Sequence, residues 1–154
     1  MIKINFVCYG NICRSPMAEF LFKKLVLDKG VEKDFYVVSS ATSTEELYHR
    51  VHYGTARILD RYGIDYSSKR AEQVRKQDYD NYDYFICMEE YNAVCLRRIF
   101  NGDKDNKIKL LLDFTDESRD VADPYYTGNF EQTYSDVVKG INALYKHLTE
   151  KGGK

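Results

Sequence analysis

The chain has 154 residues, of which 23 are Lys or Arg and 24 are Asp or Glu, and its formal net charge at pH 7 is −1. A chain of this length is expected to fold as one domain, residues 1–154, around a buried core. The balanced charge excludes a strongly basic surface, so we expect no nucleic-acid partner. The apolar runs are too short to cross a bilayer, so we expect no membrane partner either.

Cysteine usage indicates the redox compartment. The first residues are typical of a core strand rather than of a secretory signal, and the four cysteines are Cys8, Cys13, Cys87 and Cys95. Reduced thiols are typical of a cytoplasmic protein, which is the location that we predict. A zinc site needs closely spaced Cys or His pairs, so we expect no metal and no other cofactor. We also expect a monomer.

The first expected elements are a strand and a helix joined by a short loop. Ile2–Val7 is rich in β-branched and aromatic residues, as a buried strand would be. Ser15 is a suitable N-cap and Pro16 a suitable first residue for the helix that follows. The apolar stripe of this helix ends near Gly30.

The remaining elements continue this alternation. The expected strands are Phe35–Ser39, Asp83–Met88 and Ile108–Leu112, and the expected helices carry Val51, Ile58, Leu59 and Tyr62, then Tyr91, Val94, Cys95 and Ile99, then the apolar residues between Phe130 and Leu148. Strands that alternate with helices favour an α/β fold in which helices cover both faces of a parallel sheet. Ligands bind such sheets beyond the carboxyl ends of the strands, where the first loop lies.

This first loop, Cys8–Arg14, places a cysteine between a strand and the start of a helix. Its amides converge with the positive end of the helix dipole, which is expected to lower the pKa of the Cys8 thiol and to bind a phosphate dianion. Arg14 can hold two phosphoryl oxygens at once. Gly10 permits close backbone approach, and Asn11 tolerates left-handed backbone angles. An isolated cysteine would be read as a core residue, but this setting favours a nucleophile.

A candidate acid lies near the other end of the chain. Phosphoryl transfer from an aryl ester leaves a phenolate, which a carboxylic acid should protonate. Asp123-Pro124 is a turn-forming pair, so Asp123 is expected to project from a loop. Tyr125 and Tyr126 could form an aromatic wall for a flat substrate ring. Taken alone, Asp123 would be an ordinary turn residue, and only its pairing with the first loop favours a catalytic role.

The chain resembles the low-molecular-weight protein tyrosine phosphatases along essentially its full length. The resemblance rests on Cys8-Tyr9-Gly10-Asn11-Ile12-Cys13-Arg14-Ser15-Pro16, Ser39-Ser40-Ala41, Phe85-Ile86-Cys87-Met88 and Asp123-Pro124-Tyr125-Tyr126. It implies a Rossmann-like three-layer sandwich with a four-stranded parallel sheet. It also implies a phosphatase that takes phosphotyrosine proteins as substrates, releases inorganic phosphate and forms a phosphocysteine intermediate.

The resemblance implies a role for each residue of the two motifs. Cys8 would be the nucleophile, Arg14 the phosphate ligand and Asp123 the acid and later the base. The implied substrate-binding residues are Tyr9, Gly10, Asn11, Ile12, Cys13, Ser15, Tyr125 and Tyr126.

Supporting roles are implied as well. Ser15 would hydrogen-bond the Cys8 sulfur, while Asn11 and Ser40 would brace the loop. Cys13 is either a redox partner that forms a reversible disulfide with Cys8 or a small buried loop residue, and both interpretations stay open.

Three departures from the family pattern bear on specificity. Lys69 stands where many relatives carry a histidine. The segment 43–50 replaces a stretch that often lines the pocket, and Tyr48 is its candidate lining residue. Tyr9 is bulkier than the usual residue after the nucleophile and is expected to narrow the pocket mouth.

Three other functions are open at this stage. An arsenate reductase on the same scaffold would need further reactive cysteines, but Cys87 falls inside an apolar strand. A protein-arginine phosphatase would be expected to carry Thr at the position of Ile12. A phospho-binding module without turnover would be expected to lose the nucleophile or the acid, and this chain keeps both.

Overall fold

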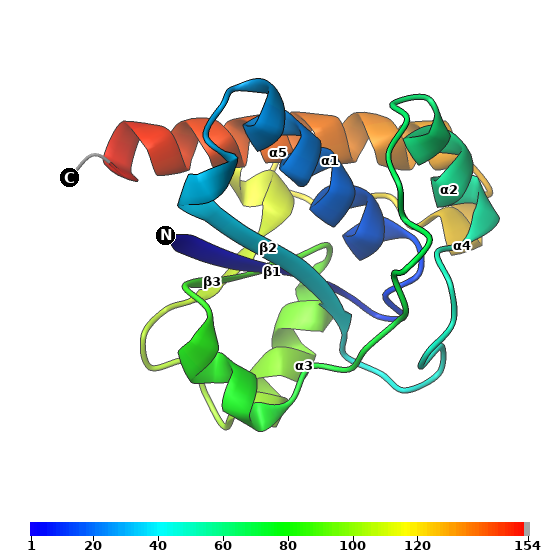
Figure 1. The fold of residues 1–154 in the computed structure, drawn as a ribbon. Coiled ribbons are helices and arrows are strands. Elements are labelled where there is room, and N and C mark those ends of the chain that lie inside the picture. The colour runs from blue at the N-terminus through cyan, green and yellow to red at the C-terminus, as the bar shows by residue number, and fades with distance from the viewer. Residues whose placement is uncertain (153–154) are drawn as a thin grey trace.

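The computed structural model describes residues 1–152, so the last two residues of the predicted domain lie outside the described part. A four-stranded parallel sheet has the strand order β2-β1-β3-β4 and forms the middle layer (Figure 1). The strands are β1 (Ile2–Cys8), β2 (Phe35–Ala41), β3 (Tyr84–Cys87) and β4 (Ile108–Leu110). The predicted α/β fold class is confirmed.

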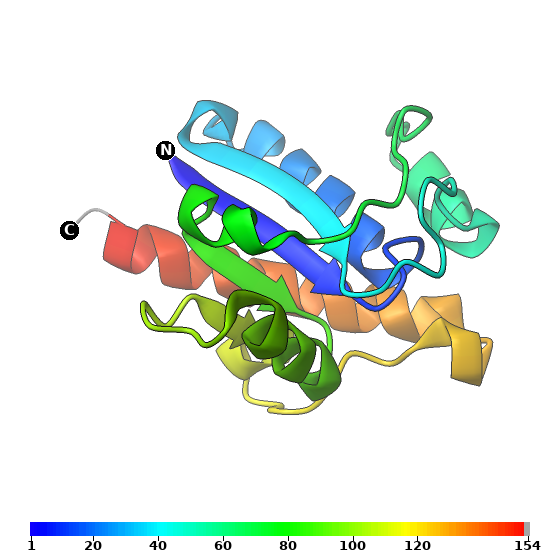
Figure 2. The same ribbon diagram turned by 90° about the horizontal axis from the view of Figure 1, so that it is seen from below.

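Helices cover both faces of this sheet, and the view from below in Figure 2 separates the two layers. The α-helices are α1 (Arg14–Asp28), α2 (Tyr53–Asp60), α3 (Glu90–Phe100), α4 (Pro124–Thr127) and α5 (Phe130–Gly152), and the 3₁₀-helices are η1 (Glu32–Asp34), η2 (Lys76–Asn81) and η3 (Leu111–Phe114). Helices α1 and α5 lie on one face and α3 on the other, while α2 and α4 lie near the carboxyl ends of β1 and β2.

The alternation of side chains along β1 creates two hydrophobic cores. Phe6 and Cys8 face the core under α1 and α5, whereas Val7 faces the core under α3. On the first face, the Phe22 ring packs edge-on against that of Phe35 with centroids 5.5 Å apart. On the second face, the Phe85 and Phe100 rings are 4.8 Å apart. Because β1 is buried on both faces, its carboxyl end is held firmly from either side.

The start of α1 differs from the prediction. The helix begins at Arg14, and Cys13 is its N-cap without a side-chain cap bond. Ser15 therefore lies inside the first turn, and Pro16 is the third helical residue rather than the first. The physical reason is that the Ser15 hydroxyl contacts the Cys8 sulfur, so it does not cap the backbone. This earlier start places the Arg14 side chain on the helix itself.

Helix α3 exists as predicted, but its buried face differs from the apolar residues named in the sequence. Tyr91 is 54% exposed, whereas Ala93 and Leu96 are buried. The polar Asn92 is turned inward because its side-chain oxygen accepts hydrogen bonds from the amides of Met88 and Glu89 at the end of β3. This cap overrides the apolar pattern.

Within residues 1–152, no helix combines the length and the apolar character that a membrane span requires.

Candidate active site

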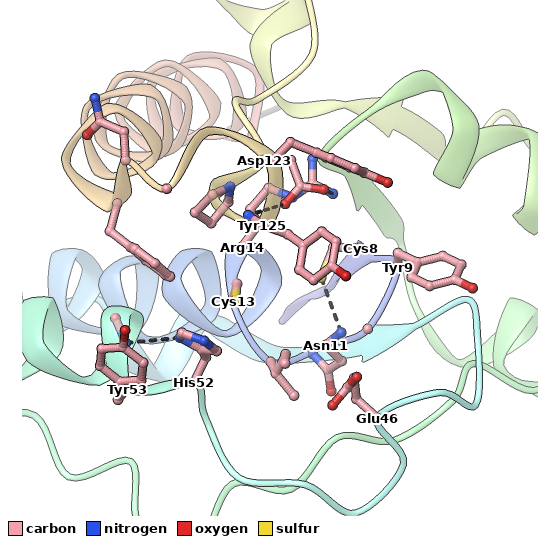
Figure 3. Close-up of a pocket in the computed structure, with 18 of the residues that line it drawn as sticks. Cys8, Tyr9, Asn11, Cys13, Arg14, Glu46, His52, Tyr53, Asp123 and Tyr125 are labelled. Atoms are coloured by element: carbon pink, nitrogen blue, oxygen red, sulfur yellow. Dashed lines mark hydrogen bonds and ion pairs between the residues drawn. The ribbon is translucent and has the colours of Figure 1, made fainter.

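The predicted phosphate-binding loop lies at the carboxyl end of β1 and opens into a pocket of about 930 Å³. The loop residues 8–14 form its floor, and its walls come from the residues after β2, from α2, from the start of α3 and from residues 123–131. The two sequence motifs, more than a hundred residues apart in the chain, therefore line the same pocket (Figure 3).

The Cys8 sulfur is buried and lies between two hydrogen-bonding groups. The Asn11 amide donates to Sγ at 3.3 Å, and the Ser15 Oγ is 2.9 Å from Sγ. Ser15 Oγ accepts a hydrogen bond from the Asn11 side-chain amide, which leaves the hydroxyl proton for the sulfur. Asn11 has a φ of 60°, so the predicted left-handed residue in the loop is present. Both donors stabilise negative charge on the sulfur.

Four of the loop carbonyls are directed outward from the loop. They accept hydrogen bonds from residues outside the loop, and these bonds are Thr42 N to Cys8 O, Ser43 N to Tyr9 O, His52 N to Ile12 O and Thr55 Oγ1 to Cys13 O. In a trans peptide the N–H points opposite to the C=O, and the described chain has no cis peptide bond. The amides of Gly10, Cys13 and Arg14 therefore point to the inner side of the loop, where an anion could accept from them.

Arg14 closes the loop from the first turn of α1. Its side chain is 3% exposed, and Nη1 donates to Glu89 Oε2 at 2.7 Å and to the Val121 carbonyl at 3.1 Å. Nη2 donates to Asp123 Oδ2 at 3.2 Å. Burial by itself would lower the Arg14 pKa, but negative charge on Cys8, Glu89 and Asp123 raises it overall. The guanidinium is thus charged and held in one orientation.

Sequence reasoning missed Glu89. It lies two residues after the end of β3 and is the N-cap of α3, so it lies at the same sheet edge as Cys8. Its carboxylate is the partner that fixes one edge of the Arg14 guanidinium. The available signal was its position just after a predicted strand, because polar residues at that edge often belong to the site.

Asp123 projects from a loop, as predicted, and is the N-cap of α4. Its Oδ1 accepts from the Tyr125 amide at 3.0 Å, and its Oδ2 accepts from Arg14. The proline at the first position of α4 fixes the turn that presents the carboxylate. Figure 3 shows Asp123 beside Arg14, with Cys8 close to both.

A buried polar chain supports the loop from behind. Asn11 Nδ2 donates to Ser39 Oγ at 3.0 Å, and Ser39 Oγ donates to Glu19 Oε1 at 2.6 Å. Lys69 completes the chain, because its Nζ donates to the Ser39 carbonyl at 2.8 Å and lies 3.6 Å from Glu19 Oε1. Lys69, the departure noted in the sequence, thus occupies a defined position behind the loop.

The prediction that Ser40 braces the loop is wrong, because the neighbouring Ser39 is the serine that contacts the loop. Ser40 Oγ donates to Asn5 Oδ1 at 2.7 Å, whereas Ser39 contacts Asn11. The reason is the alternation of strand residues, which places the side chains of Ser39 and Ser40 on opposite faces of β2. The sequence showed both serines but not which one faced the loop.

The predicted rim residues Tyr9, Ile12, Tyr125 and Tyr126 all line the pocket. Tyr125 and Tyr126 are 83% and 82% exposed, with their rings edge to face at 5.2 Å. The Tyr9 hydroxyl donates to Glu45, and this hydrogen bond raises the Tyr9 pKa.

The segment 43–50 contributes to the pocket through different residues than expected. Glu45 and Glu46 line it, whereas Tyr48 is largely exposed and has a φ of 67°. His52 and Tyr53, which follow this segment, also line the pocket and were not singled out in the sequence.

The other thiols have different surroundings. Burial, followed by the nearby charges of Cys8 and Asp123, raises the pKa of Cys13 to about 12, so this thiol is protonated at neutral pH. Burial also raises the pKa of Cys87, whose side chain belongs to the core under α3 rather than to the core that contains Cys8. The Cys8–Cys13 disulfide stays a prediction.

Metal ligation has no candidate in the described part of the chain. Among those residues, no group of three or more His, Cys, Asp or Glu side chains is arranged to hold a metal ion.

Comparison with known proteins identifies the family. Residues 3–154 match the family model described as low molecular weight phosphotyrosine protein phosphatase. The chain is 42% identical over 153 residues to the low molecular weight protein-tyrosine-phosphatase YfkJ of Bacillus subtilis, covering 98% of each chain. The chain belongs to the low-molecular-weight phosphotyrosine protein phosphatase family.

Further relatives of this phosphatase family agree with that assignment. The low molecular weight phosphotyrosine protein phosphatase of Gallus gallus is 42% identical to this chain over 147 residues. The alignment covers 92% of each chain. The crystal structure of YfkJ superposes with a TM-score of 0.93 at 40% identity, covering 98% of this chain and 96% of that one. The expected three-layer phosphatase fold is therefore confirmed at the level of both sequence and structure.

Proposed function

We propose that this protein hydrolyses phosphotyrosine in protein substrates and releases inorganic phosphate. One observation carries the proposal. The Cys8 sulfur lies at the amino end of α1 with the Asn11 amide and the Ser15 hydroxyl on it, in the same pocket as Arg14 and Asp123. A nucleophile, an anion cradle and an acid are the three parts that cleavage of an aryl phosphate requires.

In the first step, the Cys8 thiolate attacks phosphorus, an S–P bond forms and the P–O bond to tyrosine breaks. Asp123, in its acid form, gives its proton to the departing phenolic oxygen. The inward amides of the loop bind the equatorial oxygens, where charge is greatest.

Arg14 takes part in the same step. Glu89 and the Val121 carbonyl hold Nη1, so the opposite edge of the guanidinium, with Nη2, can face the phosphoryl group. Nη2 exchanges its bond to Asp123 for a phosphoryl oxygen, which also frees the Asp123 carboxyl for the leaving group.

In the second step, water attacks the phosphocysteine, an O–P bond forms and the S–P bond breaks. Asp123 accepts the proton of the water, and the Cys8 sulfur leaves as a thiolate. The Ser15 hydroxyl stabilises that thiolate through the contact already present at 2.9 Å. Asp123 and Cys8 are then in their starting protonation states.

The wider expectations follow from this function. Residues 1–154 constitute one catalytic domain, which acts as a monomer in the cytoplasm. The four cysteines are free, which agrees with a reducing compartment.

The alternatives differ in what they require of the site. A disulfide relay for arsenate would need Cys87 on the face of the sheet that holds Cys8, but Cys87 is buried in the opposite core. For phosphoarginine, the position of Ile12 would favour a small polar residue, whereas Ile12 offers an apolar surface to a phenyl ring.

The test compares purified protein on a phosphotyrosine peptide, a phosphoarginine peptide of the same sequence and arsenate with a thiol reductant. We expect phosphotyrosine to have much the highest kcat/KM. Cys8→Ser should abolish turnover while phosphate binding is retained. Preferred hydrolysis of phosphoarginine, reduction of arsenate, or substantial turnover by the serine variant would contradict the proposal.

A further inference from the structure

The mouth of the pocket has two rims of opposite charge. Glu45 and Glu46 lie on the side of Tyr9, and Arg57 lies on α2, which begins at Tyr53. Figure 3 shows Tyr9 and Tyr53 on opposite sides of the loop that carries Cys8. A peptide that places its phosphotyrosine over Cys8 must therefore pass between the two rims.

The acidic rim is held in place by the loop itself. The Tyr9 hydroxyl donates to Glu45, and Glu46 packs so closely on Gly10 that a Cβ there would be 3.1 Å from the Glu46 Cγ. Glu46 also contacts His49 Nδ1 at 2.7 Å. Within residues 1–150, whose side chains are described, neither carboxylate has a Lys or Arg nitrogen within 4.0 Å. Neither carboxylate is thus paired with a Lys or Arg of the described side chains.

The basic rim is equally fixed. The His52 ring stacks between Tyr53, with centroids 4.6 Å apart, and Phe130, at 5.2 Å. A Cβ on Gly54 would overlap the Phe130 ring at 2.4 Å, so the start of α2 lies directly against α5. This packing fixes the orientation of α2. It therefore also fixes the position of Arg57, which lies one turn later and lines the pocket.

Arg57 carries the net charge of that rim. Arg61, the C-cap of α2, is neutralised by its ion pair with Glu131. Among the side chains of residues 1–150, Arg57 has no carboxylate oxygen within 4.0 Å. Its acidic neighbour Glu131 is ion-paired with Arg61 and interacts with Arg57 only at longer range. A positive charge that lines a ligand pocket without a close carboxylate is suited to a carboxylate of the ligand.

We infer that the site selects phosphotyrosine in segments of opposite flanking charge, in which Arg57 binds an acidic side chain and Glu45 and Glu46 bind a basic side chain on the other side. The inference rests on the proposed phosphotyrosine phosphatase function. An extended peptide advances about 3.3 Å per residue, so positions close to the phosphotyrosine reach the rims.

The experiment measures kcat/KM on four phosphotyrosine peptides of equal length. Two carry Lys and Asp on the two sides of the phosphotyrosine, in either order, one carries Gln on both sides, and one carries Lys on both sides. We expect one order to exceed the other by about three- to tenfold, the range for two exposed charge contacts. The ratio should shrink as salt is raised from low to physiological concentration.

Charge reversal assigns the preference to residues. Arg57→Glu should remove the advantage of the preferred order, and Glu45→Lys should remove the advantage of the basic flank. Arg98→Glu on α3 is the matched control, because it makes the same charge change at an exposed position that does not line this pocket. Each variant is compared with its own rate on the Gln peptide, so that shared effects on chemistry cancel.

Equal kcat/KM for both orders, or the same change in ratio for Arg57→Glu and Arg98→Glu, would overturn the charge selection and leave the phosphatase function intact. If none of the four peptides is hydrolysed, the Gln peptide included, both the charge selection and the phosphatase function would be overturned.

Discussion

Asn11 and Arg14 of the phosphate-binding loop and Ser15, which follows it, are at most 3% exposed, and each is hydrogen-bonded to other side chains. Tyr125 and Tyr126 at the pocket mouth are more than 80% exposed and pack edge to face against each other. The loop is preorganised for one charge distribution, which is what transition-state stabilisation requires. The mouth is open and charged, which suits contact with varied protein segments. We therefore propose that the loop provides the chemistry and the mouth provides the selectivity.

The largest effect is expected where the loop is most tightly held. Arg14→Lys should lower kcat on phosphotyrosine by about 10²–10³-fold, because a point charge cannot replace two aligned donors. Glu89→Gln is the companion variant, since it keeps the shape of the Arg14 partner and removes its charge, and a smaller loss is expected. A mild effect of Arg14→Lys would show that the two aligned donors of the guanidinium are not needed for catalysis. The loop would then not be more important for the rate than the mouth.

The next effect depends on the substrate. Asp123→Asn should lower kcat/KM by about 10²-fold for aryl phosphates with poor leaving groups, because the phenolate is no longer protonated. Activated esters should lose little, since their phenolates leave without help. A Brønsted series of aryl phosphates measures this difference. Equal losses across the series would remove Asp123 from the role of acid.

Behind the loop, Lys69→Met tests whether the buried polar chain stabilises the protein and its site. The side chains of Lys69 and Glu19 are 10% and 6% exposed. The substitution therefore removes one of the positive charges beside the buried Glu19 carboxylate. The free energy of unfolding should fall by about 1–3 kcal/mol, and kcat/KM should fall with it. Lys23→Met, which removes the exposed partner of Glu19, is the control and should cost less. Identical losses would contradict the account.

The smallest effect is expected at the mouth. Tyr125→Ala should raise KM for phosphotyrosine peptides about threefold, in keeping with the modest energy of one aromatic contact, and should lower kcat less than it raises KM. A loss comparable to that of Arg14→Lys would erase the distinction between loop and mouth.

The sequence predicted most of the fold and the place of the Cys8–Arg14 loop between β1 and α1 because both are local patterns. Four strands and the main helices follow from apolar periodicity, and the Cys8–Arg14 loop follows from its position between a strand and a helix. Val51 and Tyr62, which were expected in the second helix, lie outside α2. Strand ends were less predictable. Leu111 and Leu112 were expected in a strand and lie in η3, since two apolar residues suit a buried turn as well as a strand.

The parts that sequence did not predict depend on tertiary contacts. The face of β2 that carries Ser39 rather than Ser40 is set by pairing with β1. The partnership of Arg14 with Glu89 joins residues 75 positions apart, and no local pattern encodes it. The predicted start of α1 was wrong because the Ser15 hydroxyl contacts the Cys8 sulfur instead of capping the helix. This contact forms only in the folded loop.

The most direct test of the central claim is to find the phosphate on the enzyme. Asp123→Asn, in which the second step lacks its base, should be mixed with an activated aryl phosphate, quenched within milliseconds and digested for mass spectrometry. The account predicts one phosphate per chain, located on the Cys8 sulfur and absent when Cys8→Ser is introduced. Release of the aryl alcohol with the phosphate on another residue, or with no phosphoenzyme formed, would contradict it.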